Sequence, residues 1–328
     1  MTIDQDRVEL PAAQQKILRD VSPAKVAREY AVLLLSVLLF LYLSFAADNF
    51  FTAVNLRNVA SQSAILGIMA SAATLLIVAG NFDLSVGAIF AASGIVTVLV
   101  VESSSMPVGV AAGLLTGMVL GLLNGVIVTR FGVNSFIATL ASSLVIGGVI
   151  LVITGGENTD TTNISFITMS ARQFLGLDLM TWVFIVWALL LGYVLARSIY
   201  GRYMYAAGGS AVAAQLSGVP VTGIRTATFV VSGLGAAIAG ILSASQSGSV
   251  PVTAGSNLVL ISIAAVVVGG TSIWGGDGAV WRTVVGVVFL SLIDNGFNLL
   301  DLDPLYGNIV YGSIILVAAA IDAQARRR

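Results

Sequence analysis

Long apolar stretches separated by short polar turns cover the chain from about residue 31 onward. A helix of about 20 apolar residues crosses the hydrocarbon core of a bilayer. The pattern therefore predicts an all-α, polytopic membrane bundle of about ten transmembrane helices. The predicted spans are residues 31–47, 57–80, 84–103, 106–129, 134–154, 178–198, 222–246, 257–271, 278–300 and 306–323.

Two of these boundaries need an argument. The apolar run from Ile65 to Val101 is too long for one crossing. Gly80, Asn81 and Asp83 supply the break between the second and third spans. The eighth span is short and rich in glycine, which makes it the weakest of the ten.

The stretch from Tyr200 to Val221 departs from the spanning pattern. Ser210 is suited to cap a helix start, and Ala211 to Ser217 is long enough for two turns. Gly218 is suited to a left-handed closing position, and the following proline prevents continuation. Two turns cannot cross a bilayer. We expect a small, partly apolar helix that docks on a protein surface.

Composition supports a membrane protein and excludes several other classes. Apolar residues make up 57% of the 328, charged residues 9%, and the mean hydropathy is +0.99. The absence of cysteine and histidine removes disulfides, thiolate chemistry, the usual transition-metal ligands and the commonest general base. With a net charge of −1, the chain lacks the excess of basic residues that is typical of nucleic-acid-binding proteins.

Charge placement predicts the orientation, because lysine and arginine are retained on the cytoplasmic side. With ten spans both termini are cytoplasmic, as polar tail 1–30 and basic tail 324–328 around a transmembrane domain at 31–323. Loop 199–221 then faces the cytoplasm and loop 155–177 the outside. The basic residues placed inside are Lys16, Arg19, Lys25, Arg28, Arg130, Arg197, Arg202, Arg225, Arg282 and Arg326 to Arg328.

Glycine recurs at every fourth position of the fourth predicted span. Each step of four advances about 40° around a helix, so these glycines form a slowly winding strip that allows another backbone to approach. We interpret the strip as a helix contact rather than a substrate site. Its members are Gly109, Gly113, Gly117, Gly121 and Gly125.

A weak internal sequence similarity is compatible with an inverted repeat. The tripeptide at Leu123–Gly125 in the fourth span resembles the one at Asp294–Gly296 in the ninth. These spans run in opposite directions in the predicted topology, as the halves of an inverted repeat do.

The strongest local motif is GNFDLSVGA, from Gly80 to Ala88. The Asp83 carboxylate can accept from free amide groups at the start of the next span and complement its positive end. The simpler interpretation is that Asp83 caps the start of a helix. The alternative is that it has a role in the mechanism of the protein. A second glycine-dense turn, Gly269 to Val280, lacks the lysine and hydroxyl ending of a phosphate loop, so the chain does not bind ATP by that route.

Two further polar groups lie inside predicted spans. Asp294, with Asn295 and Asn298, should face the bundle or a water-filled cavity, because an acid exposed to lipid costs a few kcal/mol. Proton coupling at Asp294 is the alternative interpretation. At the start of the fifth span, Asn134 to Leu140 mixes polar groups with an aromatic, which suits a sugar or an ordinary helix cap.

Four ordered blocks resemble the membrane permease subunits of ribose-type ABC importers, in the branched-chain amino acid and monosaccharide permease superfamily. The resemblance covers nearly everything after residue 30. Asn81 and Phe82 depart from the first block, and Ser210 stands where asparagine is usual. The blocks are GNFDLSVGA at 80–88; Gly201–Arg202 with Ala206–Gly209, Ala213–Ala214 and Leu216–Gly218; Gly269–Ser272 with Gly275, Gly276 and Gly278; and Asn295, Gly296 and Asn298–Leu300.

The resemblance implies a non-enzymatic transport subunit in the cell inner membrane, surrounded by lipid. It implies a second permease copy or paralogue, two ATP-hydrolysing subunits that carry ATP and Mg²⁺, and an extracytoplasmic sugar-binding protein. The short cytoplasmic helix then resembles the coupling helix that docks on the ATPase. The implied coupling residues are Arg202, Gly208, Gly209, Ser210, Ala213, Ala214, Leu216, Ser217 and Gly218.

The candidates for the substrate pathway or its gating come from the motifs above. An ion-coupled secondary transporter of a small polar solute is the main alternative, since it would also show ten spans and an inverted repeat. The identity of the sugar does not transfer from the resemblance. The pathway candidates are Asn81, Asp83, Ser85, Asn134, Phe136, Thr139, Asp294, Asn295 and Asn298.

Overall fold

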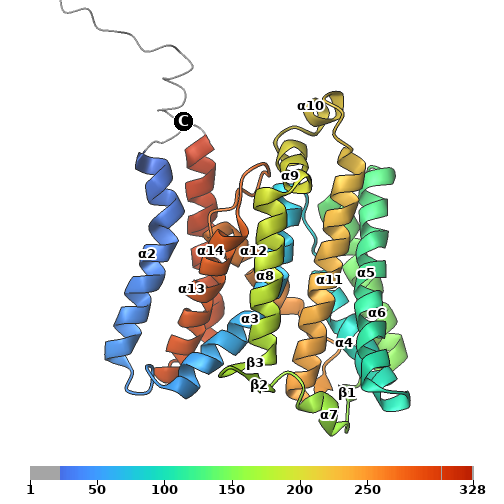
Figure 1. Ribbon diagram of the computed structural model, residues 1–328, viewed down its shortest axis with the longest axis vertical. Coiled ribbons are helices and arrows are strands. Elements are labelled where there is room, and N and C mark those ends of the chain that lie inside the picture. Colours follow the sequence, from blue (N-terminus) through green and yellow to red (C-terminus); the bar gives the residue numbers. More distant parts are fainter. Residues whose placement is uncertain (1–22, 304, 327–328) are drawn as a thin grey trace, which may run out of the picture.

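A helix lies at each of the ten predicted span positions in the computed structural model, which describes residues 23–303 and 305–326 (Figure 1). The boundaries agree with the predicted ones within a few residues, except at the first helix. The helices are α2 (Pro23–Ala46), α3 (Ala53–Val78), α4 (Val86–Ser103), α5 (Met106–Arg130), α6 (Ser135–Thr154), α8 (Leu179–Arg197), α11 (Val221–Ser247), α12 (Ser256–Val268), α13 (Val280–Leu299) and α14 (Leu305–Arg326).

Seven of the described helices are long and apolar enough to cross a membrane: α3, α4, α5, α6, α8, α11 and α13. The apolar part of α2, Tyr30–Ala46, and α12 are shorter. The protein is therefore a polytopic helical membrane protein. Ten crossings remain a prediction.

Two predicted features of the sequence differ from the structure. Helix α2 begins at Pro23, so the predicted tail 1–30 is helical in its last residues, while Lys16 and Arg19 lie outside the described residues. The loop predicted at 199–221 contains a helix that the sequence reasoning missed, α9 (Ile199–Gly209), before the predicted short helix α10 (Ala211–Leu216). Both ends of the described chain lie on the same side of the bundle as α10 (Figure 1).

The side of the bundle opposite α10 carries the loop at 155–177 (Figure 1). Within it lie β1 (Thr159–Asp160), α7 (Ile164–Ile167), β2 (Gln173–Phe174) and β3 (Leu177–Asp178). Strand β1 pairs antiparallel with β4 (Ser249–Val250), and β2 pairs antiparallel with β3. The predicted outer loop is thus tied to the segment that follows α11.

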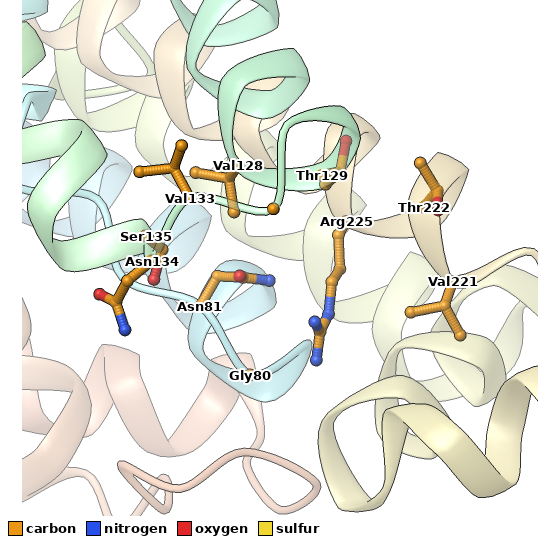
Figure 2. A pocket seen from close by; sticks show the side chains of 11 residues that line it. Gly80, Asn81, Val128, Thr129, Val133, Asn134, Ser135, Val221, Thr222 and Arg225 are labelled. Atoms are coloured by element: carbon orange, nitrogen blue, oxygen red, sulfur yellow. The ribbon is translucent and has the colours of Figure 1, made fainter.

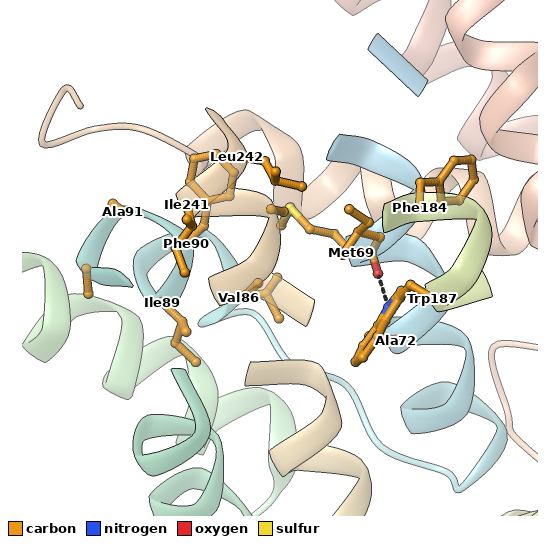
Figure 3. Packing of buried hydrophobic residues seen from close by; sticks show 14 of the residues in the cluster. Met69, Ala72, Val86, Ile89, Phe90, Ala91, Phe184, Trp187, Ile241 and Leu242 are labelled. Carbon is orange, nitrogen blue, oxygen red and sulfur yellow. Dashed lines mark hydrogen bonds between the residues drawn. The ribbon is translucent and has the colours of Figure 1, made fainter. Parts of the chain in front are cut away.

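The main buried cluster joins α3, α4, α8 and α11 (Figure 3). Met69 and Ala72 of α3 lie in it beside Phe184 and Trp187 of α8. The Trp187 indole N–H donates to the Ile68 carbonyl at 3.1 Å, so the one polar atom of this side chain is satisfied inside the core. Because 18 of its 26 residues are buried, α3 is the central helix of this part of the bundle.

The glycine strip of α5 lies against two neighbouring helices, as the sequence predicts. A Cβ atom added at Gly109 would meet the Thr97 carbonyl of α4 at 2.8 Å. Farther along, an added Cβ at Gly117 would collide with the Gly233 carbonyl of α11, and one at Gly233 with the Gly117 carbonyl. The strip is a backbone contact between helices, which membrane helices use because lipid tails are as apolar as their side chains.

This contact predicts that Gly233→Ala destabilises the protein by about 1 to 3 kcal/mol, because the added methyl group has no room against α5. Thermal unfolding of the detergent-solubilised chain measures the effect. Gly223→Ala is the matched control on the same helix, since an added Cβ there meets nothing within 4 Å. Equal melting temperatures for the two variants would contradict the close contact.

Candidate functional site

A buried carboxylate lies in the turn between α3 and α4. One Asp83 oxygen accepts from the Ser85 amide at 2.9 Å and from the Ser85 hydroxyl at 2.5 Å. The other oxygen accepts from the Ser232 hydroxyl of α11 at 2.9 Å. Burial raises the pKa of the Asp83 carboxyl, while the hydrogen bonds from Ser85 and Ser232 act in the opposite direction. The carboxylate therefore bonds the amide of Ser85, the residue before α4, rather than an amide within that helix, and it links this turn to α11.

The turn around Asp83 is bonded to two more helices. Asn124 of α5 donates from its amide to the Ser85 hydroxyl at 2.7 Å. The Leu84 amide donates to the Thr139 hydroxyl at 3.0 Å, and the Phe82 amide to the Ser135 hydroxyl at 3.2 Å, both on α6. The turn is therefore a junction at which α4, α5, α6 and α11 are joined by polar contacts. Among the predicted pathway residues, Asp83, Ser85 and Thr139 come together here.

Beside this junction lies a polar pocket of about 390 Å³, opened between the α3–α4 turn, the α5–α6 loop and the start of α11 (Figure 2). Asn81 and Asn134, two other predicted pathway residues, line it together with Arg225. The Asn134 side chain caps α6 by accepting from the Phe136 amide at 2.9 Å. Phe136 itself is exposed on α6. The cap interpretation of this motif is confirmed, and its role toward a sugar is untested.

Three glycine-rich segments meet where the turn approaches α9. The Gly276 amide donates to the Val78 carbonyl at the end of α3, at 2.9 Å. An added Cβ at Gly275 would lie 3.0 Å from the Gly80 Cα atom, and one at Gly208 would collide with the Val78 carbonyl. Gly80, Gly275 and Gly276 also have positive φ angles. Three of the four sequence blocks thus meet at one point.

Side chains from α9 and α11 reinforce this meeting point. The Arg225 guanidinium donates from Nε to the Ala79 carbonyl at 3.1 Å and from a terminal nitrogen to the Ala207 carbonyl at 3.2 Å. The Tyr205 hydroxyl donates to the Gly278 carbonyl at 2.7 Å. Arg225 therefore holds the end of α3 and the end of α9 to α11.

Helix α10 projects from the bundle next to these contacts (Figure 1). Ser210 caps it by accepting from the Ala213 amide at 3.3 Å, and Gly218 closes it with φ of +84°. Leu216 is 85% exposed and Val212 71% exposed, whereas Ala214 is buried. The predicted short helix is confirmed with its cap and its terminator, and it presents two large apolar side chains to its surroundings.

The predicted residues of α13 lie apart from the Asp83 junction. Asn295 is buried and exchanges two side-chain hydrogen bonds with Asn55 of α3, at 2.7 and 3.1 Å. Asp294 is exposed on one side but lies beside the buried Tyr311 of α14. The Asn298 side-chain amide donates to the Asp294 backbone carbonyl at 2.9 Å. These residues lie near the end of α13 opposite the α10 side, so the pathway candidates form two groups.

The sequence reasoning missed Asn55, Asn124, Ser232 and the contacts of Arg225. In the sequence, Asn124 belongs only to the repeated tripeptide and Arg225 only to the cytoplasmic charges. A polar side chain inside an apolar helix was the available signal, because such a group needs a partner in the bundle. The partner itself comes from a helix distant in the sequence.

Comparison with known proteins identifies relatives over most of the chain. Residues 55–319 match the family described as branched-chain amino acid transport system / permease component. The chain is 37% identical to the Ribose import permease protein RbsC of Escherichia coli, over 90% of this chain and 93% of that protein. It is 34% identical to the L-arabinose transport system permease protein AraH of Escherichia coli, over 90% of each chain.

A third relative is the Autoinducer 2 import system permease protein LsrC of Escherichia coli, 33% identical over 91% of this chain and 88% of that protein. No solved structure matches the chain. The matched regions cover nearly the whole length of each relative, so the similarity is not confined to one motif.

The Asp83–Ser232 hydrogen bond predicts coupled effects on stability. Asp83→Asn should lower the free energy of unfolding by about 1 to 3 kcal/mol. The change replaces one of two buried carboxylate oxygens, which accept from Ser85 and Ser232, with an NH₂ group that cannot accept. Ser232→Ala should cost less in the Asp83→Asn background than alone, with a coupling energy of about 0.5 kcal/mol or more in thermal unfolding. Ser243→Ala on the same helix is the control and should add independently. Additivity for both pairs would contradict the bond.

Proposed function

This chain belongs to the branched-chain amino acid transport system / permease component family, and from that membership we propose its role. It is the membrane-spanning permease subunit of an ATP-driven ABC importer that translocates a monosaccharide delivered by a substrate-binding protein. The observation that carries this proposal is similarity over about nine-tenths of the chain to permeases named for ribose and L-arabinose transport. A ribose-like sugar is the proposed substrate class.

The proposed topology has ten crossings in the inner membrane, with both termini in the cytoplasm. This topology is supported by the arrangement of the chain, because the start of α2, the end of α14 and α10 all lie on the same side of the bundle (Figure 1). The proposed inverted repeat is supported by Asn124 and Asn295, the central residues of the two similar tripeptides. Each donates to a side chain at the start of another helix, Ser85 before α4 and Asn55 in α3.

We assign α10 as the coupling helix that docks in a cleft of the ATPase subunit. Its exposed Leu216 and Val212 support this role, because apolar side chains on a projecting helix gain from a partner surface. The proposed coupling residues before α10, Arg202, Gly208 and Gly209, lie in α9. Gly208 touches the end of α3, so movement of α10 and α9 is transmitted by backbone contact to the Asp83 turn.

The proposed mechanism is alternating access. ATP closes the ATPase pair, the docked helices move with it, and the permease opens outward; hydrolysis and product release reset it. ATP shifts this equilibrium only if it binds the closed pair more tightly than the open one. The chain itself has no role in hydrolysis, and ATP with Mg²⁺ belongs to the partner subunit.

The other proposed partners are a second permease copy or paralogue, membrane lipid and the binding protein. The loop at 155–177 is proposed as part of the landing surface for the binding protein. Its exposed Ile164, Phe174 and Leu175 support this, since apolar side chains on an outer loop offer a contact surface. Asn134, Phe136 and Thr139 on α6 are proposed to line or gate the sugar pathway.

Leu216→Asp is predicted to reduce sugar uptake to background, because the charge is buried without a partner when α10 docks. Since the side chain is 85% exposed in this chain, thermal unfolding should change little. The measurements are uptake in cells and recovery of the ATPase subunit with tagged chain from solubilised membranes. Leu216→Met keeps the apolar surface and should retain both. Normal uptake by Leu216→Asp would refute the assignment of α10.

Asp294→Asn tests the ion-coupled alternative. A secondary transporter predicts uptake in liposomes by this chain alone under an ion gradient and a severe loss in Asp294→Asn. Because Asp294 is exposed and distant from the Asp83 junction, we expect the variant to keep most of the ATP-dependent uptake. Uptake without an ATPase subunit, abolished by this change, would favour the alternative.

A further inference from the structure

The polar pocket on the α10 side of the bundle has features of a ligand site. Its volume of about 390 Å³ lies within the range of small-molecule sites. Its walls come from three separate segments: the α3–α4 turn, the α5–α6 loop and the first turns of α11 (Figure 2).

Asn81 supplies a buried polar group directed into this pocket. The side chain is only 4% exposed, and Figure 2 shows its amide extending toward Arg225. Its one hydrogen bond within the described residues is a long one, 3.4 Å from the amide nitrogen to the Ala79 carbonyl. A buried amide normally has more partners, so the remaining donor and acceptor capacity of Asn81 is available to a ligand.

Arg225 supplies the charge of the site. It is the only charged residue that lines the pocket, and no carboxylate in the described part of the chain forms a salt bridge with it. A guanidinium carries five N–H donors, and two carbonyls occupy only two of them. A half-buried cation is stabilised when an anion pairs with it.

Ser135 adds a hydroxyl at the start of α6. Its oxygen accepts from the Phe82 amide, which leaves the hydroxyl proton to donate. The first turns of α6 and α11 both line the pocket, and the positive ends of helices favour an anion. The wall therefore combines one cation with amide and hydroxyl groups that suit the hydroxyls of a sugar.

We propose that this pocket binds a small polyhydroxylated anion, a sugar monophosphate in chemical class, with its phosphate on Arg225 and its hydroxyls on Asn81 and Ser135. Such a ligand would join α11, the α3–α4 turn and α6, which surround the Asp83 junction. Because the ligand would bind this arrangement of helices more tightly than any other conformation in the transport cycle, it would stabilise this conformation and slow transport. The slowing rests on the proposed function, whereas the binding does not.

Calorimetric titration of the full detergent-solubilised chain tests the binding, with ribose 5-phosphate, ribose and inorganic phosphate as probes. We expect ribose 5-phosphate to bind at least about tenfold more tightly than either of the others, because only it engages both the cation and the amides. Arg225→Gln should weaken it at least about tenfold, and the isosteric Asn81→Asp should weaken it by repulsion. Thermal unfolding checks that each variant is folded.

Arg130→Gln is the matched control. It removes the same charge from the exposed last residue of α5, which does not line the pocket, so binding should change by less than about threefold. An equal loss in Arg130→Gln and Arg225→Gln would reduce the effect to general surface charge and overturn the site. Ribose binding as tightly as its phosphate, or no binding by the folded wild-type chain, would also overturn it.

A lipid headgroup carries the same phosphate chemistry. Displacement of ribose 5-phosphate by a short-chain phosphatidylglycerol, together with no sugar phosphate binding in nanodiscs that contain this lipid, would overturn the proposal in favour of a lipid site. A chain that binds ribose 5-phosphate but does not transport sugar with an ATPase subunit would leave this site standing and refute the proposed function instead.

Discussion

Close contact between helix backbones is the interaction on which the rest of this structure depends. In a bilayer the surrounding lipid is as apolar as leucine, so burial of apolar side chains cannot by itself bring helices together. This chain brings α5 against α4 and α11 through glycines, at distances where a single methyl group would collide. The same device recurs outside the spans, where Gly80, Gly208 and Gly275 meet beside α10.

Polar side chains then fix which helices meet. Asp83, Asn124 and Ser232 come from a turn and two helices, and their hydrogen bonds are made inside the bundle. The paired amides of Asn55 and Asn295 do the same between α3 and α13. Each such group is costly without its partner in an apolar environment, so the bonds select one arrangement among many that pack equally well.

The local features of this fold could be predicted from the sequence, and the long-range ones could not. Hydropathy located a helix at all ten positions, and the cap at Ser210 and terminator at Gly218 defined α10. Helix α9 was missed because three of its 11 residues are glycine, which has a low helix propensity, and because it is too short to cross a bilayer. The bond of Asn295 to Asn55 could not be predicted, because hydropathy does not show which distant helix lies opposite a polar residue.

The Asn55–Asn295 pair has a consequence for how the protein is made. The two residues are 240 positions apart, so at about 5 to 20 residues per second Asn295 is synthesised roughly 10 to 50 s after Asn55. During that interval the ribosome-bound chain holds α3 in the membrane without its partner on α13. The polar contact of α3 is therefore completed only when residue 295 has been translated, 240 residues after Asn55, so assembly of this part of the bundle is late relative to the synthesis of α3.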